Sequence, residues 1–79
     1  MTEEVRQLEH MIEIVARMIP AEQRSVDVYH DVASGAKLER WRLLFEHLAD
    51  QEKQHLDKLT ATLEILQNEL REMKRGAGS

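Results

Sequence analysis

The segment EEVRQLEHMIEIVARMIPAEQRSVDVYHDVA, residues 3–33, carries a helical pattern that continues without a break. Its apolar positions recur at alternating intervals of three and four residues, which places them on one face of an α-helix. Thr2 is suited to cap the first turn, and two glutamates in that turn interact favourably with the helix dipole. We therefore expect a helix over residues 3–33. The residues on its stripe are Val5, Leu8, Ile12, Val15, Ile19, Glu22, Val26, Tyr29 and Ala33.

Pro20 lies in the middle of this pattern. Proline lacks a backbone N–H, and its ring clashes with the carbonyl group four residues earlier, so it kinks or ends a helix. If the helix ended before Pro20, Ile19 would be a poor N-cap for the next helix, and the stripe would have no reason to stay in phase. A continuous helix with a kink near Pro20 is the favoured interpretation, and two separate helices are the alternative.

A second helical pattern follows the only interior break, Ser34–Gly35, where Gly35 suits a left-handed C-cap. The second stripe also steps by three and four residues, except for two consecutive steps of four around Leu59, which would locally unwind a supercoil. We expect this helix over residues 37–75, followed by a disordered tail at 76–79. The stripe contains Leu38, Trp41, Phe45, Leu48, Glu52, His55, Leu59, Leu63, Leu66, Leu70 and Met73.

The two patterns predict an all-α fold in which residues 1–75 form a two-helix antiparallel hairpin. With 79 residues, the chain is one small domain that buries little surface by itself. Met11, Met18 and Val32 widen the apolar face of the first helix enough for contacts with two neighbouring helices. Because a single hairpin would leave such faces in water, we expect two copies to dimerise into a four-helix bundle.

Composition excludes several function classes. The absence of cysteine removes disulfides, thiolate metal sites and cysteine nucleophiles, and leaves histidine and carboxylate as the strong metal ligands. The net charge of -4, with basic residues scattered among acidic ones, argues against a nucleic-acid surface. No run of eighteen apolar residues exists, and the charged N-terminus does not resemble a signal peptide, so we expect no membrane span and a cytoplasmic location.

Three polar residues interrupt the two stripes: Glu22 in the first helix, and Glu52 and His55 in the second, within LADQEKQHL, residues 48–56. Glu-x-x-His puts both side chains on one helix face, where bundle proteins present them to one metal. Two buried carboxylates beside a histidine need compensating charge, which a metal supplies. In a two-fold dimer the set doubles to four carboxylates and two imidazoles. The four negative charges of the carboxylates would balance two divalent cations.

The run EQRSVDVYHDVASGAKLERWRLLFEHLADQEKQHLDKL, residues 22–59, resembles the helical hairpin of the ferritin-like, rubrerythrin-like di-iron carboxylate family. In that family a ligand glutamate precedes a tyrosine by seven residues, as Glu22 precedes Tyr29. The motif LFxxLAxxExxH closes the second helix, as in LFEHLADQEKQH. A ferritin-like domain normally holds two such hairpins, whereas this sequence holds one. It is therefore most similar to the encapsulated-ferritin type, whose two-helix protomers build a di-iron site across a dimer interface.

The resemblance implies ferroxidase activity, in which dioxygen or peroxide oxidises Fe(II), for iron storage or detoxification. Glu52 would bridge the two metals, Glu22 and His55 would be terminal ligands, and Tyr29 would hydrogen-bond to the site. The resemblance also implies two iron ions per dimer, with manganese as the alternative metal, and rings of dimers. An encapsulin shell is a further implied partner, although the tail MKRGAGS does not look like an encapsulin-targeting peptide. The sequence also shows no rubredoxin-like domain for electron delivery.

Simpler interpretations of the same residues remain open. Glu52 and His55 could form a polar layer that sets the register of a coiled coil. Tyr29 could be an ordinary core tyrosine with a backbone partner. Two function classes therefore remain. The first is a ferroxidase or a peroxide-consuming di-metal protein, and the second is a metal-free helical module that binds itself or a partner.

Other histidines and the methionines are expected to play no part in a site. Asp27 and His30 form an Asp-x-x-His pair off the main stripe, where a solvated face is favoured. His10 and His47 are expected on the surface. Met11 and Met18 lie at helical spacing and are expected to fill the core, as Trp41 is near the turn.

Overall fold

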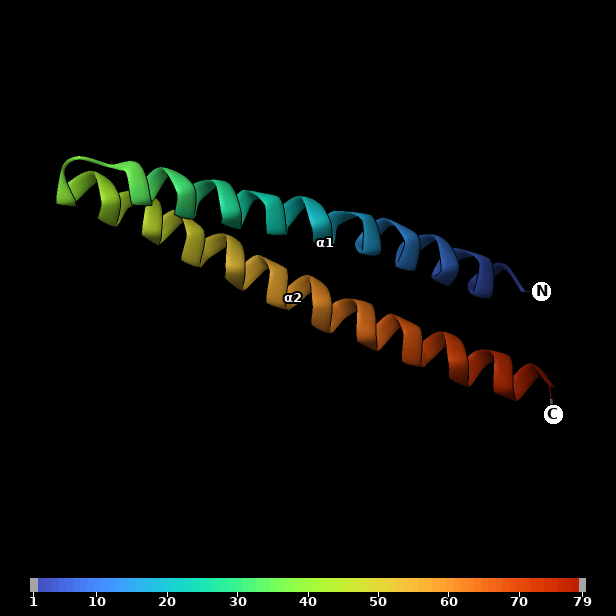
Figure 1. Ribbon diagram of the computed structural model, residues 1–79. Helices are drawn as coiled ribbons and strands as arrows, with labels where there is room; N and C mark the ends of the chain where they lie inside the picture. Colours follow the sequence, from blue (N-terminus) through green and yellow to red (C-terminus); the bar gives the residue numbers. More distant parts are fainter. Residues whose placement is uncertain (1, 79) are drawn as a thin grey trace.

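The computed structural model describes residues 2–78, with side chains through Gly76, and shows an antiparallel hairpin of two long helices (Figure 1). These are α1, Glu3–Gly35, and α2, Glu39–Gly78. The backbone spans 62 × 14 × 13 Å, and both chain ends lie opposite the turn (Figure 1). The predicted cap is confirmed, because Thr2 Oγ1 accepts a hydrogen bond of 3.2 Å from the backbone N–H of Val5.

The helix boundaries confirm some predictions and correct others. α1 passes through Pro20 without ending, so the continuous helix is confirmed, while the bend itself stays a prediction. The left-handed cap is wrong: Gly35 is the last helical residue, and no described glycine has a positive φ. The chain leaves the helix because Ala36 is extended, with φ of -70° and ψ of 129°. α2 continues through residues 76–78, where the sequence predicted a tail, and Ser79 lies outside the described residues.

The two helices pack along one seam. Every residue of the predicted α1 stripe is buried or half-buried, and Val5, Leu8, Val26 and Ala33 are at most 6% exposed. Removing this stripe from water is the main source of stability for a hairpin whose individual helices contribute little by propensity. The α1 part of the pattern is therefore confirmed.

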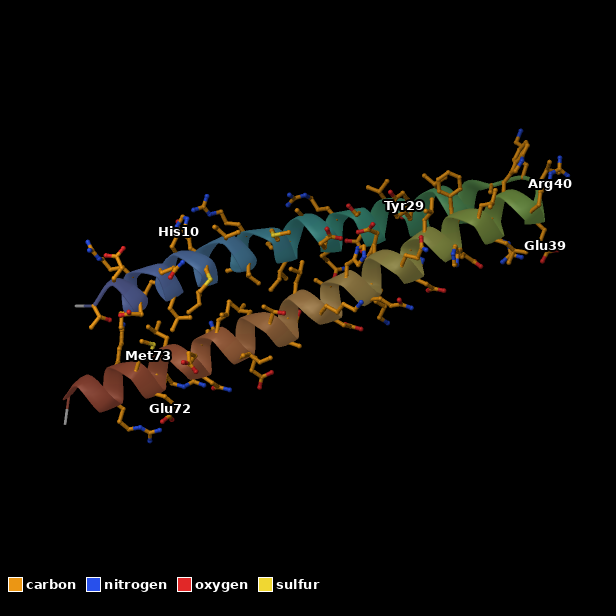
Figure 2. The ribbon with its side chains drawn as sticks, turned by 180° about the vertical axis from the view of Figure 1, so that it is seen from behind. His10, Tyr29, Glu39, Arg40, Glu72 and Met73 are labelled. Atoms are coloured by element: carbon orange, nitrogen blue, oxygen red, sulfur yellow. The ribbon has the colours of Figure 1, made fainter. Side chains whose placement is uncertain are left out.

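On α2 the predicted stripe is wrong at Leu38, Trp41, Leu48 and His55, which are exposed. The neighbouring row faces α1 instead, because the small side chain of Ala49, with 0% exposure, lets the two backbones approach closely. In this row the intervals alternate strictly between four and three residues. The two consecutive steps of four that were predicted around Leu59 are therefore wrong. The α2 seam contains Phe45, Ala49, Glu52, Leu56, Leu59, Leu63, Leu66, Leu70 and Met73. The C-terminal end of this row is visible at Met73 (Figure 2).

One long side of the hairpin, which we call the apolar flank, carries large apolar side chains in water. Its residues repeat at heptad spacing beside the seam on both helices, and each is between 37% and 67% exposed. The two helices share this side, because one cavity joins Met18 of α1 to His55 and Thr62 of α2. The apolar flank consists of Met11, Ile14, Met18, Val28 and Val32 on α1, and Trp41, Leu44, Leu48 and Ile65 on α2.

The opposite side of the seam is polar. There, Lys74 Nζ lies 3.5 Å from Glu9 Oε2, which is the only ion pair between the helices among the described residues. Gln23 and Lys53 occupy the equivalent heptad positions nearer the turn and are exposed. Charged residues recur along both helices, and within residues 2–78 neither helix is long and apolar enough to cross a membrane. The hairpin therefore has one apolar and one polar long side.

Candidate metal centre

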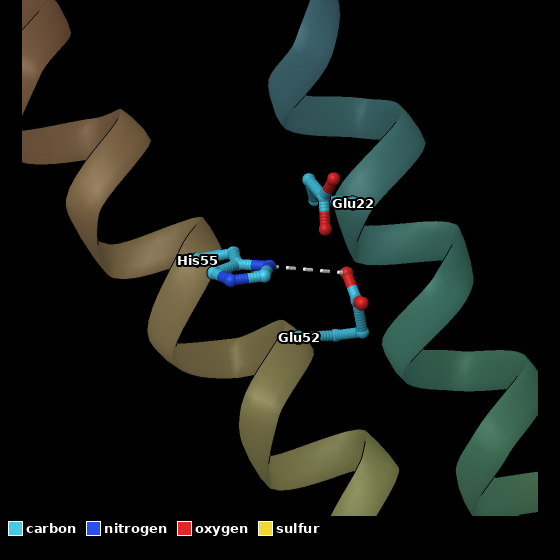
Figure 3. Close-up of side chains that lie close together, drawn as sticks. All are labelled: Glu22, Glu52 and His55. Carbon is cyan, nitrogen blue, oxygen red and sulfur yellow. Dashed lines mark ion pairs between the residues drawn. The ribbon is translucent and has the colours of Figure 1, made fainter.

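Glu22 of α1 meets Glu52 and His55 of α2 near the middle of the hairpin (Figure 3). The two glutamates lie at the same level because each is thirteen residues from the turn end of its helix. One ligand atom from each of the three residues lies within 4.8 Å of the other two, and His55 Nδ1 is 3.8 Å from Glu52 Oε2. The structure thus brings together the three predicted ligands. It forms no other group of three or more such side chains among the described residues.

The three side chains differ in burial. Glu22 and Glu52 lie in the seam and are half-buried, with the Glu52 side chain 24% exposed, whereas the His55 side chain is 60% exposed and borders the apolar flank. Oε2 of Glu22 is buried and has no hydrogen-bond partner among the described residues. An unpartnered buried oxygen is unfavourable, so contact with a cation or a donor group would stabilise it.

The neighbouring carboxyl group raises the pKa of Glu22 above its ordinary value of 4.5. The main cause is a hydrogen bond with Glu52, which two carboxyl groups form only when one of them holds a proton. Partial burial and repulsion by Glu52 act in the same direction, and attraction by His55 acts in the opposite one. In the absence of a cation, the site therefore holds a proton more tightly than an isolated glutamate does.

This raised pKa predicts a pH-dependent stability for the metal-free protein. Folded Glu22 binds its proton more tightly than the unfolded chain, so the stabilisation is fully present below pH 4.5 and is lost as the pH rises through the raised value. The glutamine side chain of Glu22→Gln stays neutral at every pH in this range. The melting temperature of Glu22→Gln minus that of the wild type should therefore increase with pH across this window and then level off.

The measurement is thermal unfolding, followed by circular dichroism with a chelator present. Glu64→Gln is the control, because Glu64 is exposed on α2 away from the site, and its profile should run parallel to the wild type. A difference between Glu22→Gln and the wild type that is constant with pH would contradict the assignment.

A cavity of about 250 Å³ adjoins Glu22 and His55 on the side of the apolar flank. Glu22 and His55 form part of its wall, and Met18, Lys58, Leu59 and Thr62 complete it. Sequence reasoning missed Lys58 and Thr62. Heptad spacing could have found them, because Lys58 follows His55 by three residues and Thr62 follows it by seven, which puts all three on one side of α2.

Tyr29 lies in the seam one heptad beyond Glu22 and is half-buried. Its ring packs against Phe45, with ring centroids 6.3 Å apart and a tilt of 44°. No hydrogen bond joins its hydroxyl group to the three ligands among the described residues. This placement favours the interpretation of Tyr29 as a core tyrosine, and its predicted hydrogen bond to the site stays a prediction.

The remaining histidines lie away from the cluster. Asp27 and His30 are exposed, and Asp27 Oδ1 accepts a hydrogen bond of 3.0 Å from Gln23 Nε2. His10, labelled in Figure 2, and His47 are exposed as well. Their predicted surface positions are therefore confirmed.

Comparison with known proteins returns no match: no family model, curated protein or solved structure is significantly similar to this chain. The resemblance of residues 22–59 to the ferritin-like family therefore stays a prediction. Beyond that motif, the function of the protein is inferred from the geometry of the site and of the apolar flank.

Proposed function

We propose that the protein is a ferroxidase, which oxidises Fe(II) to Fe(III) at a di-iron site formed between two protomers. The observation that carries the proposal is the buried, unpartnered oxygen of Glu22 beside Glu52 and His55. A divalent cation there would contact this oxygen and remove the repulsion between the two carboxylates. Carboxylate and imidazole donors suit iron, with manganese as the alternative metal. The residues therefore fit such an ion.

The three candidate ligands of one chain make up half of the proposed di-iron site. Glu22, Glu52 and His55 supply three side chains on one wall, and the cavity beside them opens toward the apolar flank. In ferritin-like bundles one Glu from each of two helices and a Glu-x-x-His pair from each of the other two enclose both metals. A second copy of the hairpin, docked on the apolar flank, would complete this set. Its four carboxylates would balance the charge of two Fe(II) ions.

The extent of the apolar flank supports a second copy centred on the site. On α1, Met11 lies eleven residues before Glu22 and Val32 ten residues after it. On α2, Trp41 lies eleven residues before Glu52 and Ile65 thirteen residues after it. At about 1.5 Å per residue the apolar flank reaches about 15–20 Å to either side of the ligands. A two-fold axis through the site would superpose this surface on itself.

The ends of the apolar flank fit the same arrangement. The heptad rows that carry it continue toward the chain termini with Glu4 and Gln7 on α1, and with Glu69 and Glu72 on α2, and all four residues are exposed. In an antiparallel dimer centred on the site, the turn of the second copy would end near these polar residues. Such a dimer pairs α1 with α1 and α2 with α2, and it places Trp41 of one copy near Ile65 of the other.

The chemistry proposed for this site is electron transfer from iron to dioxygen. Two Fe(II) ions each lose one electron, and dioxygen gains these two electrons and two protons to give hydrogen peroxide. Anionic carboxylates stabilise Fe(III) more than Fe(II), which favours the oxidation. We assign Glu52 as the bridging ligand and Glu22 and His55 as terminal ligands. Tyr29 would act from the seam by hydrogen-bonding to the site.

The biological role we propose is iron storage or detoxification in the cytoplasm. Rings of dimers and enclosure in an encapsulin shell are further proposals, which rest on the resemblance of residues 22–59 alone.

Anaerobic titration with Fe(II), followed by admission of air, tests the proposed function. We expect binding to saturate at one Fe(II) per chain and the bound iron to be oxidised faster than free Fe(II) in the same buffer. The alternative function is a metal-free helical module that associates through the apolar flank. A dimer that binds no Fe(II) in this titration would support that alternative. Replacing dioxygen by peroxide in the same experiment identifies the preferred oxidant.

A further inference from the structure

The cavity beside the cluster contains two hydrogen-bond donors for which the ferroxidase chemistry has no use. Lys58 and Thr62 line it together with the ligands Glu22 and His55. No hydrogen bond or ion pair joins the Lys58 ammonium group or the Thr62 hydroxyl group to another described residue. By contrast, Thr60 donates to the carbonyl oxygen of Leu56 at 2.9 Å. Lys58 and Thr62 thus keep their donors free at the edge of the site.

The charge of the site becomes more positive when it binds iron. As ligands, Glu22 and Glu52 contribute two negative charges per chain, and Lys58 contributes one positive charge. The half-site would therefore carry one positive charge with Fe(II) and two positive charges with Fe(III). An anion is attracted most strongly to the ferric site.

We infer that this cavity binds a small oxyanion of the inorganic phosphate class, held by Lys58 and Thr62 next to the iron. The inference rests on the proposed ferroxidase function, because the iron supplies most of the attraction. The cavity volume of about 250 Å³ is large enough. A water molecule occupies about 30 Å³ in the liquid, so a tetrahedral oxyanion fits beside the ligands. Binding of phosphate to the ferric form stabilises the product of the oxidation and retains it at the site.

The second copy leaves this subsite intact. In the dimer centred on the ligands, Lys58 faces Leu48 of the apolar flank and the neighbouring Gln51 on the second copy. Neither residue is anionic, so the second copy supplies no carboxylate from these rows to neutralise Lys58. Leu48 would cover the cavity and reduce the access of water, which strengthens the attraction between Lys58 and a bound anion.

The test uses the full-length protein, loaded with one Fe(III) per chain and desalted to remove free iron. Equilibrium dialysis against radiolabelled inorganic phosphate measures binding to the wild type and to Lys58→Gln, Lys58→Arg and Lys53→Gln. Lys53 lies on the polar side of the same helix and serves as the matched control. We expect Lys58→Gln to weaken phosphate binding at least about fivefold, because one charge-assisted hydrogen bond is lost. Lys58→Arg and Lys53→Gln should bind as the wild type does, and the metal-free protein should bind no phosphate.

The possible failures are distinguishable. If the wild type retains iron but binds no phosphate, or if Lys58→Gln and Lys53→Gln bind it equally, the oxyanion subsite is wrong and the ferroxidase proposal stands. If the wild type retains no iron after desalting, both proposals are wrong. Lys58→Gln must retain the same iron content as the wild type. A loss of iron in this variant would make Lys58 a stabiliser of the metal site and would overturn the oxyanion assignment.

Discussion

Replacing Glu52 by alanine should lower the initial rate of Fe(II) oxidation by more than about 100-fold, because even groups that only support a metal ligand contribute about 10–100-fold. Glu52 lies in the seam with Glu22, and its Oε2 is 3.8 Å from His55 Nδ1 (Figure 3). His55→Ala should reduce oxidation in the same way. The measurement is the increase of Fe(III) absorbance after air is admitted to protein loaded anaerobically with Fe(II).

Stability measurements separate loss of a ligand from loss of the fold. Without metal, Glu52→Ala removes a carboxylate that raises the pKa of Glu22 by hydrogen bonding and repulsion. The metal-free variant should therefore melt no lower than the metal-free wild type at neutral pH. Fe(II) should raise the melting temperature of the wild type but not that of Glu52→Ala. Glu64→Ala, which changes an exposed glutamate of the same helix, should behave as the wild type in both experiments. Unchanged oxidation in Glu52→Ala and His55→Ala would refute the proposed site.

Leu44→Glu should dissociate the proposed dimer, whereas Leu43→Glu should leave it intact. Leu44 is 62% exposed and Leu43 is 53% exposed. The two side chains project at similar angles from the seam, on opposite sides of α2. Only Leu44 belongs to the apolar flank. Burying a leucine side chain contributes about 1.5–3 kcal/mol, and each dimer contains two copies of Leu44. We therefore expect the dissociation constant of the dimer to increase at least about 100-fold.

Sedimentation velocity over a range of protein concentrations measures this change. The monomeric Leu44→Glu should also oxidise Fe(II) slowly although its own three candidate ligands are intact, because the second copy supplies half of the site in the proposed dimer. Leu43→Glu controls for the added charge and for any effect on helix stability. If both variants stay dimeric, or both dissociate, the apolar flank is not the dimer interface.

Glu22 and Glu52 were predictable as candidate ligands because polar residues on a regular apolar stripe stand out. Glu22 and Glu52 interrupt the seam, and their equal distances from the turn bring them to one level of an antiparallel hairpin. The helix start was predictable for a similar local reason, since the hydroxyl group of Thr2 caps the first turn. These features depend on contacts within a few residues or on a strict period, so short-range reasoning is sufficient for them.

The inward face of α2 was not predictable, because two adjacent rows of that helix are both apolar. One row contains Leu48 and His55, and the other contains Ala49 and Leu56. Hydrophobicity alone favours the row with the larger side chains. Close packing favours the row with Ala49, because the two backbones can approach only where a side chain is small. This choice moves His55 from the seam to the edge of the apolar flank.

The two long helices, the break between them and the three candidate ligands were predictable from the sequence, because they depend on periodicity and on the position of polar residues. Which row of α2 packs inward depends on the fold, and so do the side of the hairpin that stays apolar and the residues that line the cavity. The inward row must fit the shape of the α1 surface, and a pattern of apolar positions along the chain contains no information on that shape. Lys58 and Thr62 became visible as neighbours of the ligands only once that row was known.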